Sequence, residues 1–360
     1  MSLTLKDVMA IGTAATACLL AGTWSCASAL LGTCKALATD IGALPALLPG
    51  IPVAAGSTYL WHPLPGTLAA LPEPEGVTGR QMPKGGLDMR EATAQVLGQI
   101  YRCGGCSSLP GLRGYWPKCS LECFDQLSQS WAPLPQMSRR REAHSATALL
   151  GKLYVCGGID EAAIHASAEC FDPASVTWRE LPSMAFARFD HAAAALRGKL
   201  YVCGGLVGKA DGVASMERFD PARSCWTPMP SMTGRRATGG HRAAGLRGKL
   251  YVLSNAHDDG NVPVECFDLS KALWAILGPM PIADPSIAKP GGKFCKLNLE
   301  VTAWQGMLYV AHSRWVGPAR TPLDSMLRLD PGTGVWEPRP CCVYQLSSAP
   351  AESRLHALCA

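Results

Sequence analysis

Short apolar runs that end at turn residues recur along the chain between about residues 90 and 340. In one clear copy, residues 144–150 and 152–156 are two such runs, each with the length of a strand. They are joined at Gly151-Lys152, where glycine can take the positive φ of a tight hairpin. The pair Gly157-Gly158 ends the second run, because two residues without Cβ allow a sharp turn. The pattern predicts an antiparallel hairpin.

The same copy continues with a second hairpin. Residues 168–171 form a third run, and Asp172-Pro173 supplies the Asp and Pro that a type I turn favours. Trp178 opens a fourth run, which ends at Leu181-Pro182. We therefore expect a unit of four short antiparallel strands.

This unit occurs five times in the chain. Its second strand carries a tyrosine in every copy, at intervals of 53, 47, 50 and 58 residues: Tyr101, Tyr154, Tyr201, Tyr251 and Tyr309. Its fourth strand carries a tryptophan: Trp131, Trp178, Trp226, Trp274 and Trp336. A glycine pair ends the second strand in the first three copies: Gly104 and Gly105, Gly157 and Gly158, Gly204 and Gly205. Units of about 50 residues with four strands each are typical of propeller blades.

These motifs resemble those of the Kelch family: an apolar strand running into Gly-Gly, then spaced aromatic residues, then a Trp followed by Leu-Pro or Met-Pro. The resemblance covers some 250 residues and implies an all-β fold, a Kelch-type β-propeller. The fourth and fifth copies depart from the pattern, because Ser254-Asn255 and His312-Ser313 replace the glycine pair. Residues 1–50 match nothing in the family.

Five units leave open strand edges unless something completes the ring. The segment Trp61-His-Pro-Leu-Pro65 matches residues 131–135, so we expect it to be the last strand of a sixth blade. Residues 341–346 and 353–359 would supply strands one and two of the same blade. The expected organisation is therefore an extension over 1–50, rich in Ala and Gly, and a propeller over 51–360, closed by its own ends as a monomer.

The N-terminal extension holds 27 residues without charge, from 8 to 34, which is long enough to span a bilayer. Gly, Thr and Ser lower the hydrophobicity of this segment, and Ala27-Ser28-Ala29 resembles a small-residue cleavage site. A signal peptide, a membrane anchor and a disordered extension all stay open. Several of the 16 cysteines recur at fixed strand positions, which favours buried packing and a reducing compartment. The expected location is the cytoplasm, with membrane anchoring or secretion as the alternative.

The two faces of such a propeller differ in their connections. One face holds the short Gly-Lys and Asp-Pro turns, and the other holds long, variable loops, where function concentrates. The loops that enter the first strand of each unit are basic and should lie near the axis. We predict a partner-binding rim there, formed by Arg139, Arg140, Arg141, Arg188, Asp190, Arg235 and Arg236, with Lys289, Lys293 and Lys296 nearby. Acidic residues follow further out: Asp160, Glu161, Asp211, Asp258 and Asp259. An acidic peptide or a phosphopeptide fits such a rim, and the alternative is ordinary solvated loop charge.

Metal chemistry has weak support. His144, His191 and His241 hold equivalent places in three units, so a whole blade separates each from the next and a structural role is expected. Cys106 and Cys119 lie in one long loop, where zinc binding or a disulfide is the alternative to free thiols.

No phosphate-binding loop, nucleophile elbow or H-E-x-x-H motif occurs, so we expect no catalytic residues, no metal and no cofactor. The net charge of +5 contains no long basic run, so a nucleic-acid partner is not expected. The sequence thus favours a protein-binding platform, with a role as a ubiquitin-ligase substrate adaptor as one version. The runner-up is a Kelch-fold enzyme, such as an oxidase, sugar epimerase or specifier-type lyase, that uses the same face.

Overall fold

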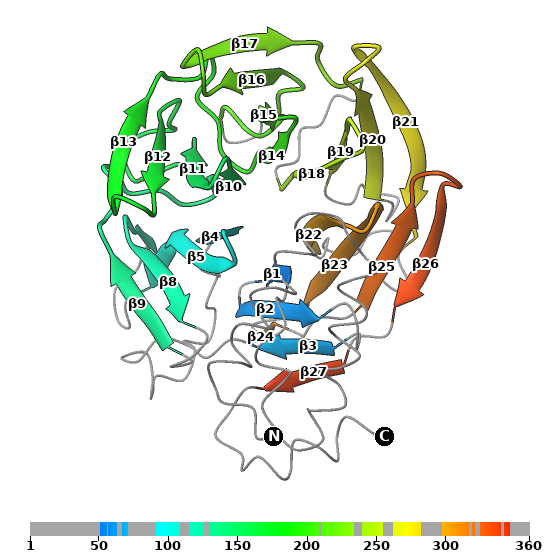
Figure 1. Ribbon diagram of the computed structural model, residues 1–360, viewed down its shortest axis with the longest axis horizontal. Coiled ribbons are helices and arrows are strands. Elements are labelled where there is room, and N and C mark those ends of the chain that lie inside the picture. The colour runs from blue at the N-terminus through cyan, green and yellow to red at the C-terminus, as the bar shows by residue number, and fades with distance from the viewer. Residues whose placement is uncertain are drawn as a thin grey trace, which may run out of the picture. The chain divides into compact units, whose positions relative to one another are not determined.

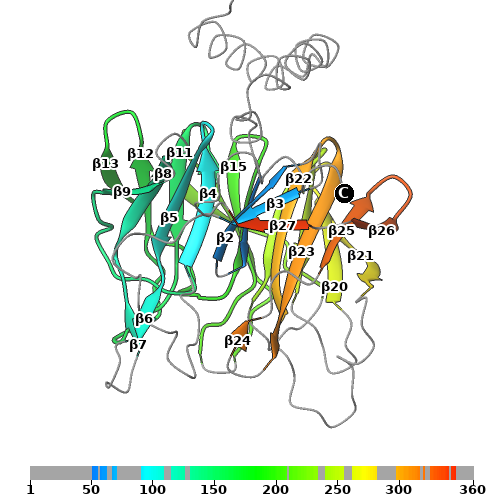
Figure 2. The same ribbon diagram turned by 90° about the horizontal axis from the view of Figure 1, so that it is seen from below.

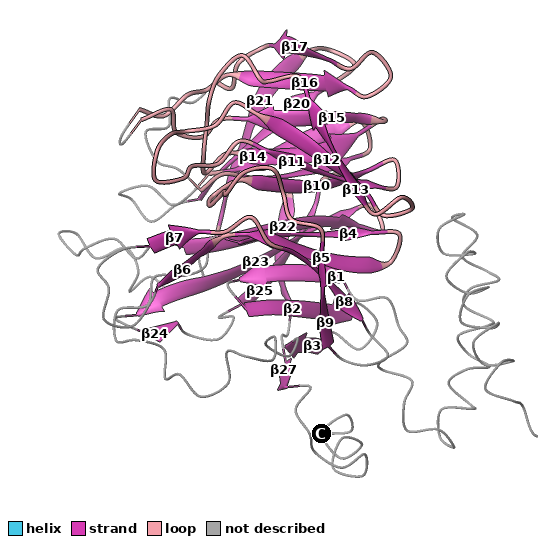
Figure 3. Ribbon diagram, turned by 90° about the vertical axis from the view of Figure 1, so that its left-hand side faces the viewer, coloured by secondary structure: helices cyan, strands magenta, loops and turns pink. Residues whose placement is uncertain are grey.

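The structure is a computed structural model, and every regular element in its described part is a β-strand (Figure 3). The described residues are 51–55, 57–62, 67–70, 91–108, 115–125, 130–208, 211–233, 240–254, 262–281, 297–316, 319–320, 325–339 and 342–345. Across these ranges, no helix is long and apolar enough to cross a membrane. The predictions for residues 8–34 and 353–359 lie outside the described residues.

The five units form five sheets that follow one another around an axis (Figure 1). Sheet 1 has the order β4 (Glu91–Val96), β5 (Gln99–Gly104), β8 (Leu121–Asp125), β9 (Ser130–Leu134). Sheet 2 has β10 (Ser145–Leu149), β11 (Lys152–Cys156), β12 (Ala168–Asp172), β13 (Thr177–Leu181). Sheet 3 has β14 (Ala192–Leu196), β15 (Lys199–Cys203), β16 (Met216–Asp220), β17 (Cys225–Met229). The Kelch-type propeller predicted from the repeats is confirmed.

Sheets 4 and 5 continue the series with longer outer or central strands. Sheet 4 has β18 (Arg242–Leu246), β19 (Lys249–Leu253), β20 (Val262–Asp268), β21 (Leu273–Met280). Sheet 5 has β22 (Leu297–Trp304), β23 (Met307–Val316), β25 (Ser325–Asp330), β26 (Val335–Arg339), with β24 (Ala319–Arg320) beside β23. A separate hairpin, β6 (Cys106–Ser108) and β7 (Tyr115–Pro117), follows β5. It lies at the end opposite the β12–β13 turn (Figure 2).

The turn between the first two strands is shifted by one residue from the predicted position. Strand β10 ends at Leu149 and β11 begins at Lys152, so Leu150 and Gly151 form the turn. Both have positive φ, 51° and 72°, which is the type I′ geometry that matches the twist of a hairpin.

The two ends of the propeller segment share one sheet, as predicted, but in a different strand order. Sheet 6 has β1 (Ile51–Ala55), β2 (Ser57–His62), β3 (Thr67–Ala70) and β27 (Cys342–Gln345). Trp61 therefore lies in the second strand instead of the last, and the C-terminal segment supplies the outer strand, parallel to β3.

The connection from sheet 5 explains this order. Only residues 340 and 341 separate β26 from β27, and three peptide steps reach about 11 Å. The innermost place in a four-stranded sheet is about 14 Å from the outermost one, so the chain can reach only the outside of sheet 6.

The innermost strands close a circle around the axis. Strands β4, β10, β14, β18, β22 and β1 contact one another in that order, and β1 contacts β4. The core lies between neighbouring sheets: Tyr154 and Cys156 of sheet 2 pack with Leu200 and Phe219 of sheet 3. The repeated cysteines are part of this core, as Cys156 and Cys203 are fully buried.

The recurring tryptophans pack on the outer side of each sheet. Trp131, Trp178, Trp226 and Trp274 each place the ring 5.1 to 5.2 Å from a buried phenylalanine of the neighbouring strand. All five tryptophans, Trp336 included, are half-buried, and Trp178 packs against the apolar cluster between sheets 1 and 2. The outermost strand has no further strand to cover its outer side.

Candidate functional site: the loop face and the axial lumen

Two faces are defined by the direction of the strands. The hairpin face carries the turns after the first and third strands, such as Leu150-Gly151. The loop face carries the connections that enter the first strand and follow the second strand. On sheets 2 and 3 these connections are held by antiparallel bridges, Glu142 with Ile159 and Phe189 with Leu206. A small apolar cluster beneath them contains Ala143, Phe189 and Leu206. The loop face here is therefore fixed in shape.

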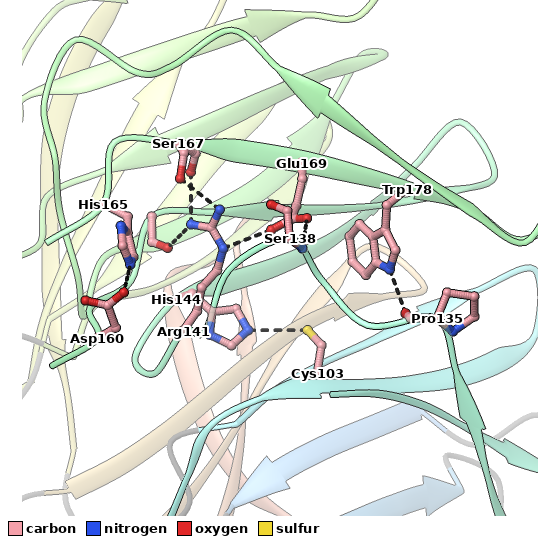
Figure 4. A network of polar contacts seen from close by, with 11 residues as sticks. Cys103, Pro135, Ser138, Arg141, His144, Asp160, His165, Ser167, Glu169 and Trp178 are labelled. Atoms are coloured by element: carbon pink, nitrogen blue, oxygen red, sulfur yellow. Dashed lines mark hydrogen bonds and ion pairs between the residues drawn. The ribbon is translucent and has the colours of Figure 1, made fainter. Parts of the chain in front are cut away.

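Arg141 lies inside this face instead of on its rim (Figure 4). Its side chain is 1% exposed, and its Nε donates to Oε1 of Glu169 at 3.1 Å. Nη1 donates to the carbonyl oxygens of Gly157 and Ser167, and Nη2 to the Ser167 hydroxyl. The backbone N–H of Ser138 donates to the other oxygen of Glu169 at 2.9 Å. Arg141 and Glu169 thus tie the entering loop to β11 and β12.

Arg188 repeats this arrangement one sheet further on. It is 0% exposed, donates to Glu217 at 2.7 Å, and bonds the carbonyl of Gly204 at 2.8 Å. The N–H of Ala185 donates to the same carboxylate. The prediction that Arg141 and Arg188 form an exposed binding rim is wrong. Both guanidinium groups are buried, and they pair with the buried carboxylates of Glu169 and Glu217.

The other predicted rim residues have different positions. Arg139 and Arg140 are exposed, and Arg140 lies 3.9 Å from Glu161. Asp190 is half-buried at the axis, while Arg235 and Arg236 lie outside the described residues. The basic rim therefore rests on Arg139 and Arg140 among the described residues.

Backbone hydrogen bonds connect the entering loops of sheets 2, 3 and 4 on the loop face. The N–H of Asp190 donates to the carbonyl of Ala143 at 2.8 Å, and the N–H of Gly240 donates to the carbonyl of Asp190 at 2.9 Å. All three residues have positive φ and directly precede the recurring histidine. Asp190 is thus fixed by its backbone. Burial lowers the pKa of His241, and the backbone and charge of Asp190 oppose this decrease.

His144 and His191 each lie between two glycines, and His241 lies against one, Gly204. A Cβ on Gly157 would lie 2.6 Å from the ring of His191, and one on Gly205 would lie 2.6 Å from its Cβ. Nε2 of His191 lies 2.9 Å from the Ser145 hydroxyl, and Nε2 of His144 lies 3.3 Å from Sγ of Cys103. The glycine pairs are therefore required because a histidine ring occupies the space of a side chain.

Burial keeps these rings neutral. It lowers the pKa of His144 to about 3 and that of His241 to about 4, and lowers the pKa of His191 well below its usual value. The described residues contain no group of three side chains that could hold a metal ion. Cys106 and Cys119 are not joined by a disulfide, and Cys119 donates to Gln136.

The axis encloses a lumen of about 520 Å³, lined mainly by alanine, serine and threonine of the first strands. Larger and polar side chains also line it, among them Glu91, Gln95, Trp304 and the three histidines. Within this lining, Nε of Arg242 on β18 lies 3.2 Å from Oε1 of Glu300 on β22. Burial raises the pKa of Glu300, and Arg242 opposes the increase. Arg242 also donates to the carbonyl of His241.

Comparisons with known proteins agree with this architecture. A model of the Kelch motif matches residues 140–185 and 187–233. The chain contains Kelch repeats. A solved structure described as "Structure of YjhT" is similar to this chain with a TM-score of 0.55 and 12% identity, over 76% of this chain and 87% of that one. At this identity the likeness shows the fold alone. No curated protein matches the sequence.

The Kelch repeats contain one feature that the sequence analysis missed, the buried Arg–Glu pair. Its signal is present in the sequence: an arginine stands three residues before the histidine in two units, at Arg141 and Arg188. A glutamate also recurs in the third strand, at Glu169 and Glu217. Charged residues that recur at repeat positions therefore indicate internal pairs.

Proposed function

We propose that this Kelch propeller binds a partner protein on the loop face of sheets 2 and 3. The main support for the proposal is that the loops entering the first strands contain both buried and exposed arginines. Arg141 and Arg188 are buried and hold the loops rigid, while Arg139 and Arg140 extend into solvent. Rigid loops lose little conformational entropy on binding, which favours affinity. Exposed guanidinium groups pair well with carboxylates or phosphates, so the partner is an acidic segment.

The wider role follows from this platform. The protein would act as a substrate-recognition or scaffold subunit, working as a monomeric propeller in a reducing compartment. Cys156 and Cys203 are not disulfide-bonded, which is consistent with that compartment, and burial raises the pKa of each to about 12.

The test is affinity purification with a charge-reversal variant, Arg139→Glu with Arg140→Glu. The control is Arg223→Glu, an exposed arginine in the β16–β17 turn of the hairpin face. Partners recovered with wild type and the control but lost with the loop-face variant support the proposal. Recovery of no protein above background, or equal recovery with all three proteins, contradicts it.

The lumen favours a second candidate, an enzyme or small-molecule binder that uses the axis. Arg242 and Glu300 are the observation for it, since their ion pair places opposite charges in the wall of the lumen, where a small polar ligand could contact both. Metal analysis of the purified protein tests the metal-dependent versions: stoichiometric copper, iron or zinc would favour them over the platform.

A further inference from the structure

Phe186 is an aromatic residue on the loop face whose side chain is exposed to solvent, although the residues on either side of it are fixed. It is 50% exposed, although it lies in a loop fixed on both sides. Before it, the N–H of Ala185 donates to Glu217 at 2.7 Å. After it, the fully buried guanidinium of Arg188 lies 5.9 Å from the centre of the phenyl ring. The ring therefore has a defined position without being part of the core, as aromatic anchors of interfaces have.

Arg139 occupies the equivalent place in the preceding loop. It precedes Arg141 by two residues, as Phe186 precedes Arg188. Arg139 is exposed and forms no ion pair with the described residues. Burial is the main cause of the lowered pKa of His165, and the nearby charge of Arg139 adds a smaller decrease.

The two loops are joined into one surface. The N–H of Arg188 donates to the carbonyl of His165 at 3.1 Å, and the N–H of Asp190 donates to the carbonyl of Ala143 at 2.8 Å. Residues 160–165 therefore lie between Arg139 on one side and Phe186 on the other. Val207, exposed on the next loop, extends the apolar side, because Leu206 pairs with Phe189.

We infer that Phe186 and Arg139 form a two-point docking site for an extended peptide that carries an apolar side chain a few residues from a carboxylate. This inference rests on the proposed function and names the chemistry of its ligand. The phenyl ring takes the apolar side chain and the guanidinium takes the carboxylate. A polyanion such as a nucleic acid fits less well, because the exposed carboxylates of Glu161 and Asp211 lie on the same loops.

The experiment selects peptides from a displayed library of random dodecapeptides on the purified full chain. Selected peptides are then synthesised with a fluorophore, and their Kd is measured by fluorescence polarisation for wild type, Phe186→Ala and Arg139→Ala. Matched controls on the hairpin face are Val176→Ala and Arg223→Ala, which are also exposed. Circular dichroism and Tm confirm folding of every variant, and Arg139→Ala keeps the test valid if Phe186→Ala does not fold.

We expect the selected peptides to share an acidic residue and an apolar residue. Each loop-face variant should weaken binding about ten-fold or more, and the controls should leave Kd unchanged. Peptides that bind all five proteins equally would overturn this site but leave the proposed function standing. Failure to select any peptide would contradict both. Binding of heparin that depends on Arg139 but not on Phe186, without such peptides, would assign the surface to a polyanion and overturn the inference.

Discussion

The indole Nε1 of Trp178 donates a 2.7 Å hydrogen bond to the carbonyl oxygen of Pro135, which directly follows the outer strand of the preceding sheet. The relationship recurs in the next two interfaces, from Trp226 to Pro182 and from Trp274 to Pro230, both at 2.8 Å. The tryptophan and the proline of the repeat motif therefore act on different blades. Each of these three tryptophans links its own blade to the end of the previous one.

Substitutions of Trp178 should separate this link from simple packing. Trp178→Phe keeps an aromatic ring against Phe171 but removes the donor, so we expect a loss of about 1 kcal/mol in the free energy of unfolding. Trp178→Ala also removes the ring and should cost about 3 kcal/mol, the lower end for large aromatic residues because the site is half-buried. Urea denaturation followed by fluorescence or circular dichroism measures both. Equal losses for the two variants would show that the hydrogen bond dominates and the ring contributes little.

Arg141 and Arg139 are two residues apart, but substitution should lower the stability of the protein only at Arg141. Arg141→Ala leaves Glu169 buried without its cation, which typically costs about 3–5 kcal/mol. Arg139→Ala removes an exposed side chain and should change stability by no more than about 0.5 kcal/mol. Tm and chemical denaturation of both variants provide the measurement, and similar Tm values would disprove the structural role of Arg141.

A double substitution refines this result. Arg141→Met together with Glu169→Leu removes both charges at similar volume, and it should recover a large part of the lost stability. If the double variant is less stable than Arg141→Ala, the hydrogen bonds of the pair to Ser138 and Ser167 matter more than charge balance.

Acid should destabilise the propeller through the buried histidines. Their pKa is lowered in the folded state, to about 3 for His144 and about 4 for His241, whereas the unfolded chain binds these protons near pH 6.5. As pH falls below 6.5 the unfolded state therefore gains protons that the folded state does not. Each histidine then costs up to about 1.4 kcal/mol per pH unit until its folded pKa is reached. The raised pKa of Glu300 acts in the opposite sense, but one carboxyl does not offset three imidazoles.

The variant His191→Gln tests the contribution of one histidine to this pH dependence. Glutamine can still bond the Ser145 hydroxyl, so the variant should fold, and its stability should fall less steeply between pH 6.5 and 5 than that of the wild type. Chemical denaturation at several pH values measures the slope. A slope equal to the wild-type slope would mean that His191 does not titrate differently in the two states.

The fold could be predicted from the sequence because it is repeated. The turn residues and aromatic positions recur in several copies, so the order of the four strands is supported more than once, although the exact turn position is one residue away from the predicted one. Sheet 6 lacked this redundancy: the likeness of Trp61 to Trp131 suggested a fourth strand, but the length of the connection after β26 decided the order. The length of the connection therefore determines the strand order of sheet 6 more reliably than the short sequence match does.

The binding site was harder to predict because burial cannot be read from residue type. Arginine is usually exposed, and Arg139, Arg140 and Arg141 are adjacent in the sequence, yet only the last is buried. Phe186 is the converse case, because phenylalanine is usually buried and this one is half exposed. Whether Arg141 and Phe186 are buried or exposed depends on the side of the loop from which each side chain projects. Tertiary contacts determine that side.

The outer strand of sheet 6 should be needed for a stable ring. Strand β27 pairs with β3 from Cys342 to Gln345, so truncation after residue 340 exposes the edge of β3 to other chains. We expect a lower Tm and soluble oligomers or aggregates, measured by thermal scanning and size-exclusion chromatography. Truncation after residue 345 is the matched control, because it keeps β27, and it should leave the Tm unchanged. If the shorter protein is as monomeric and heat-resistant as the control, the pairing of the chain ends does not close the ring, and the five Kelch units are sufficient without it.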